Sequence, residues 1–280
     1  MRILRVRSTG GVELALHDLG GSGPPLLITH ATGFCGRAYD PLGLLLRSSH
    51  HVWALDLRGH GDSTSPRDGD FSWSHMAEDV LAATDTIGRG PVGAFGHSMG
   101  GAAMLLAETA RPGTLRFAYL YEPIVFPSGF ATTSENRLAG PARRRRSSFA
   151  SKAEVLHRYA TRPPLNVLRA DALVAYVEHG FSEAADGTVR LKCTPDHEAR
   201  TFNAGLSVTV DQIAGVAVPV AVAIGLRAEA PHPVLAHHIV AALPAASLIE
   251  YAHLGHFGPL QDPETIVPDV LALESRSSPS

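Results

Sequence analysis

The chain has 280 residues and a formal net charge of −3 at pH 7, which argues against nucleic acid or an anionic membrane surface as its main partner. Its length allows a large core, either in one domain with an insertion or in two domains. No stretch approaches about 18 continuous apolar residues, and residues 1–19 lack the apolar run of a signal peptide. We therefore expect a cytoplasmic protein that does not span a membrane.

In its first 126 residues the chain alternates short apolar segments with longer amphipathic ones. The apolar segments predict strands at residues 12–19, 25–29, 51–57, 91–95 and 116–121. Between them the sequence predicts helices at residues 39–46, 74–87 and 100–111. Strands and helices that alternate in this way indicate a mostly parallel sheet with helices on both faces.

The alternation is interrupted at residues 127–203, where Ser, Pro and Arg become common. Short helical patterns at residues 151–159 and 171–178 predict a helical cap inserted into the core. Strand and helix signals return at residues 218–225, 234–243, 247–251 and 263–273. We expect residues 1–126 and 204–274 to form the core, residues 127–203 the cap, and residues 275–280 a disordered tail.

The segment Gly96-His97-Ser98-Met99-Gly100 follows one predicted strand and opens the next predicted helix. A Gly-x-Ser-x-Gly sequence in this place is typical of a nucleophile elbow. This is a sharp turn that strains the serine backbone, and any side chain larger than that of glycine would clash at the two glycine positions. The turn would present the Ser98 hydroxyl at the carboxyl edge of the sheet. It would also direct the Met99 N–H towards a developing oxyanion. The alternative is an ordinary glycine-rich turn.

His256 is the candidate for the general base that a serine nucleophile needs, because a neutral imidazole must accept the hydroxyl proton. It lies in a glycine-containing loop, residues 253–258, after the last predicted strand. His253 is the competing histidine, but the sequence around His256 is the better match to a loop that presents an imidazole. The chain order, with the serine first and the histidine after the final strand, also favours this pair.

Four motifs together resemble those of the α/β-hydrolase family. They are His30-Ala31-Thr32-Gly33-Phe34, Asp56-Leu57-Arg58-Gly59-His60-Gly61, Gly96-His97-Ser98-Met99-Gly100-Gly101, and Gly255-His256-Phe257 followed by Asp262-Pro263. They occur in the family's order, and the insertion resembles the family's variable cap. The resemblance implies an eight-stranded, mostly parallel sheet with helices on both faces, a Ser-His-acid triad and an oxyanion hole.

The resemblance assigns the oxyanion hole to the backbone N–H groups of Met99 and Thr32. The family usually has His-Gly after its third strand, whereas this chain has His30-Ala31, and Thr32 stands where the second donor is expected. The motif at residues 56–61 is more simply a structural turn than a catalytic element.

Two glutamates compete for the third position of the triad. Family members commonly carry the acid just after the seventh strand, where this chain has Ala228 at the usual position and Glu229 as the nearest carboxylate. A known variant carries the acid after the sixth strand, where the chain has Glu122. A carboxylate at either strand end can reach the far nitrogen of the histidine and fix its tautomer. We favour Glu229 over Glu122, and a Ser–His dyad without an acid is the third alternative.

These residues predict a cofactor-independent serine hydrolase that cleaves a small, mostly apolar ester, thioester or lactone. The same triad also serves acyl transfer, C–C bond hydrolysis or cyclisation in small-molecule biosynthesis, and a non-hydrolytic receptor for a small ligand can share the fold. The partner is a small molecule in each case, and the sequence leaves the oligomeric state open.

We expect no metal, because the His, Asp and Glu residues show no metal-ligand spacing. Cys35 and Cys193 lie far apart and match neither a disulfide framework nor a zinc pattern. The basic run at residues 143–146 is most simply a solvated face, and a site for an anionic substrate is the alternative.

Overall fold

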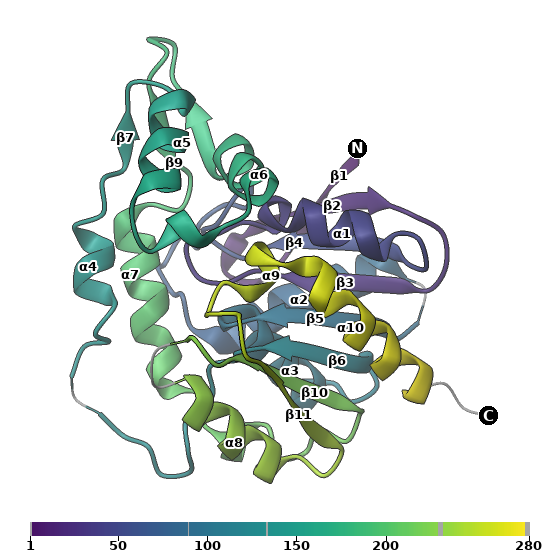
Figure 1. The fold of residues 1–280 in the computed structure, drawn as a ribbon. Helices are drawn as coiled ribbons and strands as arrows, with labels where there is room; N and C mark the ends of the chain where they lie inside the picture. The colour runs from purple at the N-terminus through teal and green to yellow at the C-terminus, as the bar shows by residue number, and fades with distance from the viewer. Residues whose placement is uncertain (1, 89, 133, 229–231, 278–280) are drawn as a thin grey trace.

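The structure is a computed structural model that describes residues 2–88, 90–132, 134–228 and 232–277 (Figure 1). Its centre is an eight-stranded sheet with the order β1-β2-β4-β3-β5-β6-β10-β11. β2 runs antiparallel to both of its neighbours, and the other neighbouring strands of this sheet are parallel. The strands are β1 (Arg2–Arg7), β2 (Glu13–Gly20), β3 (Pro25–Thr29), β4 (His51–Asp56), β5 (Val92–His97), β6 (Leu115–Tyr121), β10 (Val220–Gly225) and β11 (Ala246–Tyr251). The predicted eight-stranded, mostly parallel sheet is confirmed.

The first strand, β1, is absent from the sequence prediction. It lies at the edge of the sheet and pairs with β2 alone, so that only Val6 of its six residues is buried. An edge strand that carries arginines on its exposed positions shows little of the alternation by which strands are recognised in a sequence.

Helices cover both faces of the sheet (Figure 1). The sheet therefore separates two apolar layers of the core, one on each face. On one face, α2 (Trp73–Ile87), α3 (Met99–Ala110) and α8 (His232–Ala242) contribute to the first layer. On the other face, α1 (Asp40–Leu46) and α10 (Pro263–Ser277) contribute to the second. The described residues also form the short helix α9 (Gly258–Gln261) and 3-10 helices at Thr9–Gly11, Gly36–Tyr39, Leu165–Val167, Gly205–Ser207 and Val210–Gln212.

The last helix, α10, extends further than predicted. It continues to Ser277 and thus into the segment 275–280 that the sequence predicts as a disordered tail. Val270 and Leu273 are buried against the second apolar layer, which anchors the later turns of the helix. Within the described ranges, none of the helices is long and apolar enough to cross a membrane.

The inserted cap combines helices with a small sheet, so it is only partly helical. Its helices are α4 (Ala139–Arg143), α5 (Lys152–Thr161), α6 (Ala170–Gly180) and α7 (Pro195–Ala204). β7 (Ser148–Phe149), β9 (Val189–Leu191) and β8 (Phe181–Glu183) form an antiparallel sheet in that order. Strands of two or three residues are too short to show a recognisable alternation, which explains why the sequence analysis missed them.

The cap contacts the loops that follow the carboxyl ends of β3 and β4. Tyr176 Oη donates a hydrogen bond to Gly33 O at 2.9 Å, directly beyond the predicted oxyanion donor. Lys192 Nζ lies 2.6 Å from Asp62 Oδ1, in the loop after β4. These contacts place the cap over the edge of the sheet at which the predicted site residues lie.

The motif at residues 56–61 folds as a buried turn, in line with the structural role expected for it. Asp56 accepts hydrogen bonds from the N–H groups of Gly36 and Asp62 at 2.7 and 2.8 Å. His17 Nε2 lies 2.8 Å from the same carboxylate. Burial alone would raise the pKa of Asp56, but the contact with His17 holds it below its usual range.

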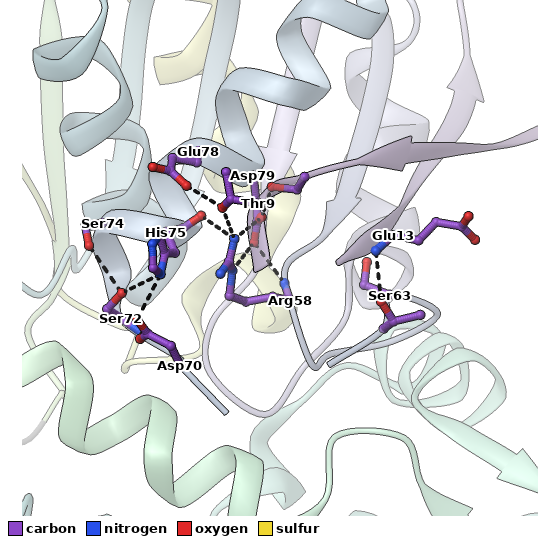
Figure 2. Close-up of polar contacts among 12 residues, drawn as sticks. Thr9, Glu13, Arg58, Ser63, Asp70, Ser72, Ser74, His75, Glu78 and Asp79 are labelled. Carbon is purple, nitrogen blue, oxygen red and sulfur yellow. Dashed lines mark hydrogen bonds and ion pairs between the residues drawn. The ribbon is translucent and has the colours of Figure 1, made fainter. Parts of the chain in front are cut away.

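A fully buried ion pair extends from this turn to α2 (Figure 2). Arg58 Nε and Nη2 donate to Asp79 Oδ2 and Oδ1 at 2.9 and 2.7 Å. Arg58 Nη2 also donates to His75 O at 2.9 Å and to Thr9 Oγ1 at 3.2 Å. The guanidinium therefore joins the turn after β4 to α2 and to the segment between β1 and β2.

We expect Asp79→Ala to lower the free energy of unfolding by about 3–5 kcal/mol, because it leaves the buried Arg58 charge without a partner. Urea unfolding followed by circular dichroism measures the loss. Asp85→Ala is the matched control, because Asp85 pairs with Arg111 on the surface, and there we expect a loss below about 1 kcal/mol. Similar small losses in both variants would contradict the structural importance of the buried pair.

Candidate active site

Ser98 lies at the turn between β5 and α3, in a backbone conformation that serine rarely adopts. Its φ is 54° and its ψ is −117°. A Cβ atom at Gly96 would lie 2.6 Å from the backbone of α3, and one at Gly100 would lie 2.6 Å from a backbone oxygen of β3. The Ser98 N–H donates to Tyr121 O at 2.9 Å and anchors the turn on β6. The strained turn predicted between a strand and a helix, with glycines on both sides, is therefore present.

Thr32 and Met99, the predicted oxyanion-hole residues, lie next to each other. Thr32 Oγ1 donates to Met99 Sδ at 3.4 Å, and both residues are buried. Thr32 comes from the loop after β3, whereas Met99 is the first residue of α3. In the parts of the chain that the structure describes, neither backbone N–H is used in a hydrogen bond. The two N–H groups are thus available as donors beside Ser98.

His256 contacts a buried carboxylate at the end of β6. Its Nδ1 atom lies 2.6 Å from Glu122 Oε2, and the Glu122 side chain is fully buried whereas that of His256 is partly exposed. An ionised carboxylate has no proton to donate and can only accept hydrogen bonds. In this contact His256 therefore carries the proton, on Nδ1. The Nε2 atom is then free to accept a proton from another group.

The Glu122 carboxylate is held on its second oxygen as well. Gly225 N–H donates to Oε1 at 2.9 Å, and the N–H of Glu122 itself donates to Ala223 O at 2.8 Å. The φ of Glu122 is 45°, and among the described residues only Glu122 and Ser98 are non-glycine residues with a positive φ. Backbone strain of this kind clusters at functional sites, so it marks Ser98 and Glu122 as candidate functional residues.

Glu229, which the sequence analysis favours as the acid, lies outside the described residues. Of the two competing glutamates, Glu122 is the one for which the structure gives a contact with His256. The competing histidine, His253, lies 3.2 Å from Asp262 and has a half-exposed side chain.

A chain of hydrogen bonds connects the loop after β3, the elbow and the loop that carries His256. Ala31 N–H donates to Tyr39 Oη at 3.1 Å, and this hydroxyl lies 2.6 Å from His97 Nδ1. His97 Nε2 in turn lies 2.8 Å from His256 O. A backbone oxygen can only accept, so His97 carries its proton on Nε2 and Tyr39 donates to Nδ1. Burial, together with the nearby His256, keeps the pKa of His97 well below its usual range, so the ring is neutral.

A polar cluster in the cap holds the loop after β3 from above. Arg145 Nη1 donates to Glu198 Oε2 at 2.9 Å, and its Nη2 donates to Tyr176 Oη at 2.7 Å and to Tyr159 Oη at 3.2 Å. Tyr176 then donates to Gly33 O. A Cβ atom at Gly33, whose φ is 81°, would lie 2.6 Å from Glu198 Oε1, so a larger residue there would displace this carboxylate and strain the backbone.

The basic run at residues 143–146 does not form a uniform face. Arg143 pairs with Glu135, and Arg146 lies 2.7 Å from Glu154, and the side chains of both pairs are exposed. These pairs agree with the interpretation of a solvated face. Arg145 instead belongs to the polar cluster of the cap, and the anionic-substrate site stays a prediction.

Two groups of described residues bring three potential metal-ligand atoms within 4.8 Å of one another: Glu122, His232 and His256, and His17, Asp56 and Asp62. In the first group the imidazole rings of His232 and His256 are stacked, with an interplanar angle of 18° and centroids 4.2 Å apart. Nitrogen lone pairs lie in the ring planes, so those of stacked rings do not converge on one ion. In the second group Asp56 is already engaged in hydrogen bonds. The absence of a metal from the reaction stays a prediction.

Comparison with known proteins agrees with the fold and the motifs. Residues 26–269 match the model of the Alpha/beta hydrolase family, and the chain belongs to this family. The (E)-2-((N-methylformamido)methylene)succinate hydrolase of Acinetobacter baylyi is 32% identical over 92 residues, which are 33% of this chain and 35% of that protein. The monoglyceride lipase of Mus musculus is 35% identical over 113 residues, 37% of each protein. The matched region thus spans about a third of the length of these curated relatives.

The likeness to solved structures extends over nearly the whole chain. The thioesterase domain from the curacin biosynthetic pathway superposes with a TM-score of 0.80 at 18% identity, over 97% of this chain and 100% of that domain. At this level of identity the likeness concerns the fold.

We expect Tyr39→Phe to lower the free energy of unfolding by about 1–3 kcal/mol, because it leaves the buried Ala31 N–H and His97 Nδ1 without their shared partner. Guanidinium unfolding of the two proteins side by side measures the difference. An unfolding free energy equal to that of the wild type would contradict the connection between the three loops.

Proposed function

We propose that the protein is a cofactor-independent serine hydrolase that cleaves a small, mostly apolar ester, thioester or lactone through an acyl-enzyme on Ser98. The observation that carries this proposal is the combination of two strained residues, Ser98 and Glu122, with the hydrogen bond between Glu122 and His256. The relatives named as hydrolases support the general class of reaction.

In the first half of the proposed reaction, Ser98 Oγ attacks the carbonyl carbon of the substrate while His256 Nε2 accepts the hydroxyl proton. Glu122 fixes the tautomer by accepting a hydrogen bond from Nδ1–H, and it stabilises the imidazolium that forms. The N–H groups of Thr32 and Met99 donate to the oxyanion of the tetrahedral intermediate. His256 then protonates the leaving alcohol, thiol or hydroxyl as the carbonyl reforms.

In the second half, water attacks the acyl group on Ser98. His256 Nε2 accepts a proton from the water molecule, and the same oxyanion donors stabilise the second tetrahedral intermediate. Collapse of this intermediate breaks the bond to Ser98 Oγ, which takes back its proton from His256. The carboxylic acid leaves and the resting state returns.

Aromatic side chains beside the reacting groups support an apolar substrate. Phe34 follows the loop that carries Thr32, and its ring centroid lies 5.6 Å from that of Phe257, the residue next to His256. The Phe34 ring also lies 4.7 Å from that of Tyr176 in the cap. Apolar walls with a few polar groups at the reacting bond are typical of small-molecule sites. A lipase among the similar proteins supports an ester bond as the target.

The first prediction from this mechanism concerns the nucleophile. A fluorophosphonate probe is expected to label the wild type at Ser98, as located by mass spectrometry of the digested protein. Ser98→Ala is expected to escape labelling and to lose at least about 10³-fold in kcat for p-nitrophenyl butyrate. Ser182→Ala, a substitution at an exposed serine, is the control and should be labelled like the wild type. Labelling at another residue, or none in a folded wild type, would refute the assignment.

The second prediction concerns the acid. Glu122→Gln is expected to lower kcat by up to about 10⁴-fold, because His256 loses the carboxylate that fixes its tautomer. Glu229→Gln is expected to stay near the wild type, which reverses the order of preference that the sequence gives. Thermal melts check that both variants are folded. A large loss for Glu229→Gln with a small one for Glu122→Gln would reject Glu122 as the acid.

A further inference from the structure

His232 lies directly on the imidazole of His256. It is the first residue of α8, in the segment that follows β10, where the sequence analysis places the acid. The two rings are nearly parallel, with an interplanar angle of 18° and centroids 4.2 Å apart. The side chain of His232 is only 13% exposed, so the ring covers one face of His256 and is itself shielded from water.

One polar atom of His232 lies near the Glu122 carboxylate. Its Nδ1 atom lies 3.7 Å from Glu122 Oε2, the same oxygen that accepts the hydrogen bond from His256 Nδ1. This Nδ1 atom is buried, and the described residues give it no hydrogen bond. Since an ionised carboxylate offers only acceptors, the tautomer with a proton on Nδ1 is the one that Glu122 favours.

His232 is uncharged at neutral pH. Burial, with His256 and Arg137 as further causes, lowers the pKa of His232 to about 3. The groups that face it are therefore the Glu122 carboxylate, the His256 imidazole and, at longer range, the Arg137 guanidinium. A neutral ring adds no like-charge repulsion when His256 becomes an imidazolium, and its π face is favourable next to a cation.

We propose that His232 is a positioning residue, whose flat neutral ring holds the His256 imidazole in the plane that directs Nδ1 at Glu122 and keeps water away from this hydrogen bond. The role rests on the proposed serine hydrolase mechanism, in which that plane also determines where Nε2 meets the Ser98 hydroxyl. It explains why an imidazole whose buried Nδ1 atom has no hydrogen bond among the described residues is placed against the pair.

Three substitutions separate the flat ring from the other properties of the side chain. His232→Phe keeps a flat ring and removes the nitrogen atoms, His232→Leu keeps apolar volume without a ring, and His232→Ala removes both. His238→Ala is the matched control, because His238 lies on the same helix with an exposed side chain. Thermal melts identify any variant that fails to fold. If the cavity that His232→Ala creates is too destabilising, the comparison is made between His232→Phe and His232→Leu alone.

We expect His232→Phe and His238→Ala to keep kcat within about threefold of the wild type, with p-nitrophenyl butyrate as the substrate. His232→Leu and His232→Ala are expected to lose about tenfold in kcat with little change in KM, since the loss affects a group that acts on the transition state. Wild-type kcat in both His232→Leu and His232→Ala would overturn the proposal. A loss in His232→Phe as large as that in His232→Leu would also overturn it, because the ring would then not be the relevant property.

A second measurement tests the stack without any turnover. In a Ser98→Ala background, the proton shared by His256 Nδ1 and Glu122 is followed by NMR as a low-field signal, assigned by its loss in Glu122→Gln. We expect the signal to persist with His232→Phe and to broaden through exchange with water with His232→Leu. A signal that stays equally sharp in both would overturn the proposal. Failure of Ser98 labelling in the wild type would refute the hydrolase mechanism instead, so the two failures are distinguishable.

Discussion

The geometry of the site depends on one buried carboxylate, that of Glu122. A buried charge is strongly unfavourable unless hydrogen-bond donors surround it, and this one accepts hydrogen bonds from the Nδ1–H of His256 and the N–H of Gly225. These donors come from the loop after β11 and from the end of β10. The register of the sheet makes this arrangement possible, because Tyr121 pairs with Ala223 and so places Glu122 beside the end of β10. The order of parallel strands thus determines where the imidazole is held.

The same edge of the sheet stores backbone strain at two places, and each is balanced by hydrogen bonds to the neighbouring strand. Ser98 N–H donates to Tyr121 O, and Glu122 N–H donates to Ala223 O. A chain of hydrogen bonds through Tyr39 and His97 then connects the turn to the loops on both sides of it. Side chains fixed by such a network lose little freedom when a substrate binds, which is the condition for electrostatic stabilisation of a transition state.

The sequence predicts best what is decided locally. The elbow is predictable because its glycines, its apolar strand and its helix are contiguous. Seven strands of the large sheet are predictable because they are short apolar runs, whereas the number eight follows only from the family resemblance. The order of preference between Glu229 and Glu122 rests on the strand end at which the family commonly carries its acid, whereas the contact with His256 depends on which strand ends lie side by side. The sequence contains one signal for Glu122. It is a charged residue directly after β6, a strand that is almost entirely buried, so its side chain is expected to need a partner inside the protein. Tyr39, His97 and His232 gave no such signal, because nothing in their local sequence distinguishes a histidine or tyrosine that contacts a distant loop.

The hydrogen bond from Tyr176 to Gly33 O has a consequence for the exchange of caps between relatives. A cap that is grafted to alter substrate preference would ordinarily be regarded as an independent module. Here the same cap, through Arg145, Tyr176 and Glu198, also supports the backbone of Gly33, the residue that follows the proposed oxyanion donor Thr32. A chimaera that omits these three side chains would change the cap and loosen the backbone of the loop after β3 at the same time. An exchange of caps between this protein and a relative therefore has to transfer the cap together with the loop after β3.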